Sequence, residues 1–164
     1  MKVIFVDHDG VICLPREWGS RFRKIKRWEL EGGEGEPPAY IRLDDLNKFA
    51  VNILNGIIIE TGAELVCSSD WRLYATLDEM KDLYIQGGLI KGPIDFTPVL
   101  QTTTKHKNIR VDEINLWLSK HPEVTHWVAI DDMDLSDLDK FVKCREREGL
   151  KQCNISSKIL KFLQ

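Results

Sequence analysis

Short apolar runs alternate along this chain with stretches in which apolar residues recur every three or four positions. The apolar runs predict strands, and the periodic stretches predict helices. The expected strands cover residues 2–6, 65–67, 94–98, 125–130 and about 140–143, and the expected helices cover residues 43–61, 72–86, 109–119 and 155–162. Strands that alternate with helices in this order form parallel sheets with helices on both faces. We therefore expect an α/β fold, a three-layer Rossmann-like domain with a parallel central sheet.

The size and composition of the chain predict one domain that spans residues 1–164. With 164 residues, of which 43% are hydrophobic and 30% charged, the chain can close one sizeable core. A formal net charge of -3 excludes a generally basic surface, so contact with nucleic acid would need a local patch. The four cysteines lack the spacing of a metal site, and no segment resembles a signal peptide or a membrane span. These features predict a cytoplasmic protein without a membrane association, and nothing indicates an obligate protein partner.

Polar side chains follow three of the predicted strands, at the point where each strand ends. Asp7 and Asp9 follow the first strand, Ser68 and Ser69 the second, and Asp131 and Asp132 the strand at 125–130. Ligands of open parallel sheets bind at this edge, because the loops after the strands converge there. Four carboxylates at one edge repel each other unless a cation lies between them, and an oxygen-only ligand set suits Mg²⁺. The sequence therefore predicts a magnesium site.

A metal ion held by carboxylates, beside a hydroxyl and a cationic side chain, is suited to phosphoryl transfer. The spacing of Asp7 and Asp9 places both carboxylates on the same side of an extended chain. One carboxylate can then attack the phosphorus while the other donates and later removes a proton. Gly10 permits a tight bend directly after the pair. We therefore expect a phosphatase with Asp7 as the nucleophile.

These segments resemble the motifs of the haloacid dehalogenase (HAD) superfamily. Asp7-His8-Asp9-Gly10 is similar to its first motif, and Asp131-Asp132 is similar to its fourth. Ser68 resembles the Ser or Thr of the second motif, although Ser69 could take this role. The third motif of the family supplies a lysine, whereas here Arg110 opens the predicted helix and Lys107 lies just upstream. We favour Arg110 for this position, with Lys107 as the substitute, because arginine can bind phosphate with two hydrogen bonds.

The chain is most similar to the small phosphatases that include the HAD domain of Swiss Army Knife RNA repair proteins. This resemblance rests on four parts of the sequence: Leu54–Ile58 in the predicted helix, the stretch Thr61–Val66, Trp71-Arg72 after the serines, and the segment Phe141–Leu150. It implies an aspartyl-phosphate intermediate at Asp7 and a role for Asp9 as general acid and general base. It also implies Mg²⁺ bound by Asp7, by the backbone carbonyl of Asp9 and by Asp131 or Asp132. In this family the segment after the first motif covers the active site, so residues 14–40 are expected to form a small cap insertion.

The prediction of the substrate depends on two sequence features, and each of them has two interpretations. The segment Arg21–Trp28 has five basic residues interleaved with aromatic and aliphatic ones, which suits stacking and charge contacts with a single-stranded nucleic acid. It equally fits a helix with an apolar stripe and a solvated basic face. Arg72 could contact substrate or support Trp71 structurally. A nucleotide or a polynucleotide end is our first expectation for the substrate, and a small phosphorylated metabolite is the alternative.

Two other classes of protein share parts of this pattern. A signalling receiver domain also has a phosphate-accepting aspartate in a parallel sheet with Mg²⁺, but that aspartate follows the third strand, where this chain has Thr97-Pro98. A binding module that kept the fold but lost turnover is the other alternative, because the motif lysine is missing. We expect the four histidines to be structural, since their spacing does not suggest a metal site.

Overall fold

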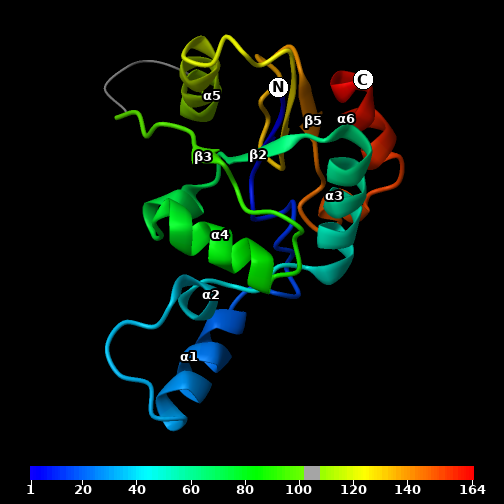
Figure 1. The fold of residues 1–164 in the computed structure, drawn as a ribbon. Coiled ribbons are helices and arrows are strands. Elements are labelled where there is room, and N and C mark those ends of the chain that lie inside the picture. The colour runs from blue at the N-terminus through cyan, green and yellow to red at the C-terminus, as the bar shows by residue number, and fades with distance from the viewer. Residues whose placement is uncertain (102–107) are drawn as a thin grey trace.

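The computed structural model describes residues 1–101 and 108–164, which fold around one parallel sheet (Figure 1). Its strands are β1 (Lys2–Val6), β2 (Glu64–Cys67), β3 (Asp95–Phe96), β4 (His126–Asp131) and β5 (Phe141–Lys143). They lie in the order β3-β2-β1-β4-β5 and all pairs are parallel. The central strand β1 aligns Val6 with Cys67 of β2 and with Ile130 of β4. The residues that follow these three strands therefore meet at one edge of the sheet.

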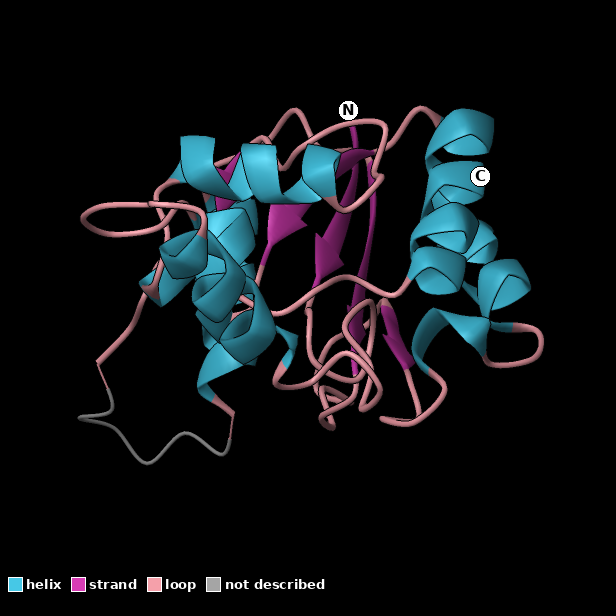
Figure 2. Ribbon diagram, turned by 90° about the horizontal axis from the view of Figure 1, so that it is seen from below, coloured by secondary structure: helices cyan, strands magenta, loops and turns pink. Residues whose placement is uncertain are grey.

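Helices cover both faces of the sheet, as Figure 2 shows. One face of β1 presents Ile4 and Val6 to a core that includes α3 (Lys48–Thr61), α4 (Leu77–Gln86) and α6 (Ile155–Leu163). The opposite face presents Val3 and Phe5 to a smaller core with α5 (Ile109–Ser119) and the loop after β4. Alternate residues of a strand point to opposite faces, so a strand covered on both sides is apolar throughout. The predicted three-layer α/β fold is confirmed.

Two predicted helices differ from the observed ones at their starts. The first begins at Lys48 rather than at residue 43, because the Asn47 side chain caps it by accepting a hydrogen bond from the Ala50 amide at 3.1 Å. The helix predicted at 72–86 begins instead at Leu77, as α4, and its start is fixed by a capping box between Thr76 and Glu79. A separate short 3₁₀ helix, η1 (Asp70–Leu73), precedes it. A second 3₁₀ helix, η2 (Gly149–Lys151), precedes α6.

The segment expected to form a cap contains α1 (Ser20–Leu30) and the start of α2 (Ala39–Arg42), joined by a loop. Both helices lie below the body of the protein in Figure 1, on the side of α4. Arg42 joins α2 to α4 through two hydrogen bonds to the Glu79 carboxylate, at 3.0 and 3.1 Å. Arg21 of α1 forms an ion pair of 2.7 Å with Asp44, which lies in the stretch that leads to α3. These ion pairs fix the orientation of the two helices.

The described residues include no helix that is both long enough and apolar enough to cross a membrane. The cytoplasmic location stays a prediction.

Candidate active site

Three carboxylates lie together at the edge of the sheet where β1 and β4 end. Asp7 follows β1, Asp131 is the last residue of β4, and Asp132 comes next. One oxygen of each carboxylate lies within 4.8 Å of the others. Asp7 and Asp131 are buried and Asp132 is half-buried. The register of β1 with β4 brings these groups together, because Val6 is aligned with Ile130.

Gly10 allows Asp132 to enter this group. Its φ angle is +70°, a left-handed conformation that other residues rarely adopt. A Cβ atom at position 10 would lie 2.5 Å from Oδ2 of Asp132, which is closer than such atoms approach each other. The tight turn after Asp9 therefore needs glycine for its backbone and for the space that the Asp132 carboxylate occupies.

Arg110 provides the positive charge of the site. Its Nη1 atom lies 2.9 Å from Oδ1 of Asp7 and 2.8 Å from Oδ2 of Asp131, and its Nη2 atom lies 3.1 Å from Oδ1 of Asp70. The arginine stands in the first turn of α5, where the Asn108 side chain caps the helix. Burial lowers its pKa, but the carboxylates of Asp7 and Asp131 raise it by more, so the guanidinium stays charged.

Burial is the main influence on the ionisation of Asp7. The pKa of Asp7 is raised to about 7, first by burial and then by the negative charge of Asp131. Arg110 and a hydrogen bond from the Ser69 side chain act in the opposite direction. The pKa of Asp132 is also raised, first by burial and then by Asp131. Burial and repulsion between the carboxylates thus both disfavour the ionised forms of Asp7 and Asp132.

The structure distinguishes between the two serines that follow β2. The Ser69 side chain makes the hydrogen bond with Asp7, and its oxygen also accepts a hydrogen bond from the Trp71 amide at 3.3 Å. Ser68 is buried, and its amide donates to the Val6 carbonyl at 3.1 Å, which extends the ladder between β1 and β2. Ser69, the alternative, is therefore the serine whose hydroxyl lies beside Asp7.

Asp9 is exposed, and its carboxylate belongs to a different contact. Its Oδ2 atom accepts a hydrogen bond of 2.9 Å from Nε1 of Trp71. The Trp71 ring stacks on the His8 ring with a centroid distance of 4.5 Å and an interplanar angle of 5°. His8 is fully buried, and burial, together with the charge of Arg110, lowers its pKa to about 3. His8 is therefore a neutral packing surface for Trp71, which in turn holds Asp9.

Arg72 is buried and its hydrogen bonds go to the protein. Its Nη2 atom lies 2.6 Å from Oε2 of Glu113 on α5, and its Nη1 atom donates to the carbonyls of Ser68 and Ser69 at 3.0 and 2.9 Å. Its Nε atom donates to the Thr97 carbonyl at 3.1 Å. Arg72 thus ties the ends of β2 and β3 to α5, which favours the structural alternative over a substrate contact.

One predicted residue cannot be placed, and two residues near the site were not predicted. Lys107, the substitute for the motif lysine, lies outside the described residues. Asp70 and Glu113 were not predicted to belong to the site. Glu113 follows Arg110 by three positions and thus shares its helix face, a spacing that could have indicated it. The position of Asp70 beside Arg110 depends on how η1 turns after β2 and has no signal in the sequence.

Comparison with known proteins identifies one family. No curated protein and no solved structure matches the chain. The sequence model of one family, described as the HAD domain in Swiss Army Knife RNA repair proteins, matches residues 3–155 of the 164. This match spans all five strands and each of the carboxylates and serines described above. The chain therefore belongs to the family of HAD domains found in Swiss Army Knife RNA repair proteins.

Proposed function

We propose that the protein is a Mg²⁺-dependent phosphatase that hydrolyses phosphomonoesters through an aspartyl-phosphate intermediate at Asp7. The observation that carries this proposal is the joint placement of Asp7, Asp131, Asp132 and Arg110 at the end of the central strands. Membership of the HAD family implies a phosphatase or a related hydrolase. The position of Asp9 two residues after Asp7 supports ester hydrolysis in particular, because the leaving oxygen needs a proton.

The donor set fits a divalent cation of the hard type. Asp7, Asp131 and Asp132 offer three carboxylates, and Arg110 neutralises one of their charges. The two charges that remain match those of Mg²⁺. The pKa of Asp7 is raised first by burial and then by the charge of Asp131, and a cation beside Asp7 would lower it again. Asp7, Asp131, Asp132 and the backbone carbonyl of Asp9 are the proposed ligands. The metal ion would neutralise charge on the phosphoryl group during transfer.

In the first half of the proposed reaction, a carboxylate oxygen of Asp7 attacks the phosphorus of the substrate. The bond from phosphorus to the ester oxygen breaks, and that oxygen takes a proton from the carboxyl group of Asp9. Ser69 and Arg110 lie beside Asp7 and can donate hydrogen bonds to the phosphoryl oxygens. The products are the free alcohol and the phosphorylated side chain of Asp7.

In the second half, the ionised carboxylate of Asp9 takes a proton from a water molecule. The oxygen of that water attacks phosphorus, the bond to the Asp7 oxygen breaks, and inorganic phosphate leaves. Both aspartates then have their original protonation states. The hydrogen bond from Trp71 keeps the Asp9 carboxylate in one position through both proton transfers.

A nucleotide or a polynucleotide end is the proposed substrate. The family is named for RNA repair proteins. A terminal phosphate that blocks the joining of a broken strand is a substrate that suits a phosphatase in such a protein. A small phosphorylated metabolite is the alternative within the same chemistry. Phosphate release from 3′- and 5′-phosphorylated oligonucleotides, from nucleotides and from sugar phosphates would rank these classes of substrate.

Hydrolysis of an aryl phosphate with Mg²⁺ tests the proposed chemistry independently of the natural substrate. We expect turnover by the wild type, loss of turnover in Asp7→Asn, and loss of wild-type turnover when a chelator removes the metal. Asp78→Asn is the matched control, because Asp78 is an exposed aspartate of α4. Equal rates in wild type and Asp7→Asn would reject the catalytic proposal and favour a binding module.

A further inference from the structure

A groove of about 550 Å³ runs between the start of α1, the start of α3 and η2. Four cationic side chains from separate segments line it: Arg16, Arg23, Lys48 and Lys151. All four residues are exposed. Segments more than 100 residues apart in the chain thus contribute the same charge to one groove.

The four cationic side chains of this groove form no ion pair within the described residues. Within residues 1–101 and 108–164, no carboxylate oxygen lies within 4.0 Å of any of the four cationic groups. The groove also contains Asp45 and Glu17, but Asp45 is paired with Lys24 at 2.7 Å. Glu17 accepts a hydrogen bond of 2.9 Å from the Asn47 side chain and keeps its negative charge. Four cations against one unpaired carboxylate leave a positive excess for a ligand that carries several negative charges.

The basic segment on α1 is divided by its contacts. Arg21 is paired with Asp44, and Lys24 is paired with Asp45. Arg23 points into the groove and has no such partner in the described part of the chain. Of the basic run in the sequence, Arg23 is therefore the residue that contributes an unpaired cation to the groove.

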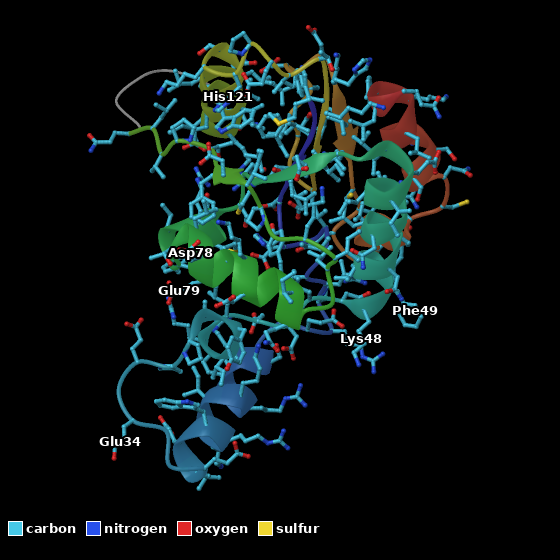
Figure 3. All side chains as sticks on the ribbon, in the orientation of Figure 1. Glu34, Lys48, Phe49, Asp78, Glu79 and His121 are labelled. Atoms are coloured by element: carbon cyan, nitrogen blue, oxygen red, sulfur yellow. The ribbon has the colours of Figure 1, made fainter. Side chains whose placement is uncertain are left out.

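An exposed aromatic ring lies among these cations. Phe49 in the first turn of α3 is 68% exposed and lines the groove next to Lys48. Figure 3 shows both side chains at the end of α3 nearest the cap, directed away from the body of the protein. An aromatic ring at an exposed position gains little from folding but can stack on a planar group of a ligand. Cations with an aromatic ring suit a strand with phosphates and bases.

The groove adjoins the loop that follows the catalytic aspartates. The amide of Asn47, a groove residue, donates to the Ile12 carbonyl at 2.7 Å, and Ile12 lies three residues after Asp9. Leu150 of η2 donates its amide to the Val11 carbonyl at 3.0 Å. Two walls of the groove are thus hydrogen-bonded to the loop Gly10–Cys13. The groove is therefore built on the loop that begins directly after Asp9.

We propose that this groove binds the single-stranded polynucleotide whose phosphorylated end enters the active site. Arg16, Arg23, Lys48 and Lys151 contact its backbone phosphates, and Phe49 stacks on a base. This inference rests on the proposed phosphatase function, which places the phosphorylated end of the polynucleotide in the active site. Binding in the groove itself does not need turnover. It distinguishes a polynucleotide from a nucleoside monophosphate, which has no further phosphate for the cations of the groove.

Fluorescence anisotropy with the Asp7→Asn protein tests the proposal without catalysis. The probe is a fluorescein-labelled, single-stranded oligouridylate without a terminal phosphate. Four phosphate contacts predict that the logarithm of the binding constant falls with the logarithm of salt concentration with a slope of about 2.8. Changing Arg16, Lys48 and Lys151 together to Gln should reduce this slope to about 0.7. Phe49→Ala should weaken binding about fivefold or more and leave the slope unchanged.

The matched control changes Lys120, Lys158 and Lys161 to Gln, which alters the net charge by the same amount. These three lysines are exposed and lie outside the groove. We expect the control to bind as the parent does. Equal weakening in both triple variants, or binding that none of the groove variants affects, would overturn the proposal. Loss of aryl phosphate turnover bears only on the proposed chemistry, because the binding assay uses a protein without the nucleophile.

Discussion

The side chains around Asp7 are positioned by hydrogen bonds that come from residues close to it in space and distant in sequence. Trp71 holds Asp9, Arg110 holds Asp7 and Asp131, and Met133 donates its amide to Oδ1 of Asp131 at 2.8 Å. A phosphoryl group can be transferred only if the nucleophile and the acid keep fixed positions relative to it. The contact of Trp71 with Asp9 is therefore the one whose removal should affect the proton transfer alone.

Trp71→Phe removes the hydrogen bond to Asp9 but keeps an aromatic ring for the stack on His8. Alkyl phosphates have poor leaving groups and depend on the proton from Asp9, so their kcat/KM should fall about tenfold. The kcat/KM for p-nitrophenyl phosphate should change less than about threefold, because this leaving group needs no proton and kcat/KM does not include hydrolysis of the intermediate. The comparison of the two substrates checks the prediction, and an equal loss with both would indicate a general structural role.

At the scale of the elements, an ion pair joins α2 to α4. Arg42 donates two hydrogen bonds to Glu79, one to the Pro37 carbonyl at 3.0 Å and one to the Tyr74 carbonyl at 2.9 Å. The same Glu79 caps α4 through the Thr76 amide at 2.8 Å. One carboxylate thus defines the start of α4 and the position of α2.

Arg42→Ala should lower the free energy of unfolding by about 1–2 kcal/mol, because it removes a two-pronged ion pair and leaves backbone carbonyls without this donor. Lys81→Ala is the control, since Lys81 forms a single ion pair with Asp78 on the exposed face of α4. It should cost less than about 0.5 kcal/mol. Urea denaturation measures both variants. Equal losses would show that the Arg42 contacts do not stabilise the packing of α2 on α4.

The strands and most helices could be predicted from the sequence because their apolar patterns are local and strong. The predicted helix at 109–119 coincides with α5, and the run at 2–6 coincides with β1. The start of α3 was predicted too early, because Leu43 and Leu46 pack against the core from outside the helix and continue its apolar pattern. The contacts of Ser69, Asp70 and Trp71 depend on the turn of η1, which brings these residues next to segments that are distant in the sequence. No local sequence pattern indicates such contacts.

At the scale of the whole molecule, the buried carboxyl group of Asp7 affects the stability of the fold. The pKa of Asp7 is about 7 in the folded protein and 3.8 as its ordinary value. Between these values the folded state holds a proton that the unfolded chain has released. Without a metal ion, this carboxyl group therefore favours the folded state at pH 4, and this contribution is lost as the pH rises through 7.

Asp7→Asn removes this dependence on pH. In the presence of a chelator the variant should be more stable than the wild type at pH 8, by about 1 kcal/mol or more, and the difference should vanish near pH 4. Mg²⁺ should raise the melting temperature of the wild type at pH 8 and affect the variant much less. Thermal melting at the two pH values, with and without Mg²⁺, checks both statements. A wild type that is more stable than the variant at pH 8 without metal would contradict them.

The most direct test of the phosphatase mechanism is the detection of the phosphorylated nucleophile. The Asp9→Asn variant should form the intermediate from an aryl phosphate and hydrolyse it slowly, because no group then takes the proton from water. Mass spectrometry of the acid-quenched reaction should find one phosphoryl group on the peptide that contains Asp7, only when Mg²⁺ is present. Phosphate release by the wild type together with no label on Asp7 in either protein would contradict the mechanism.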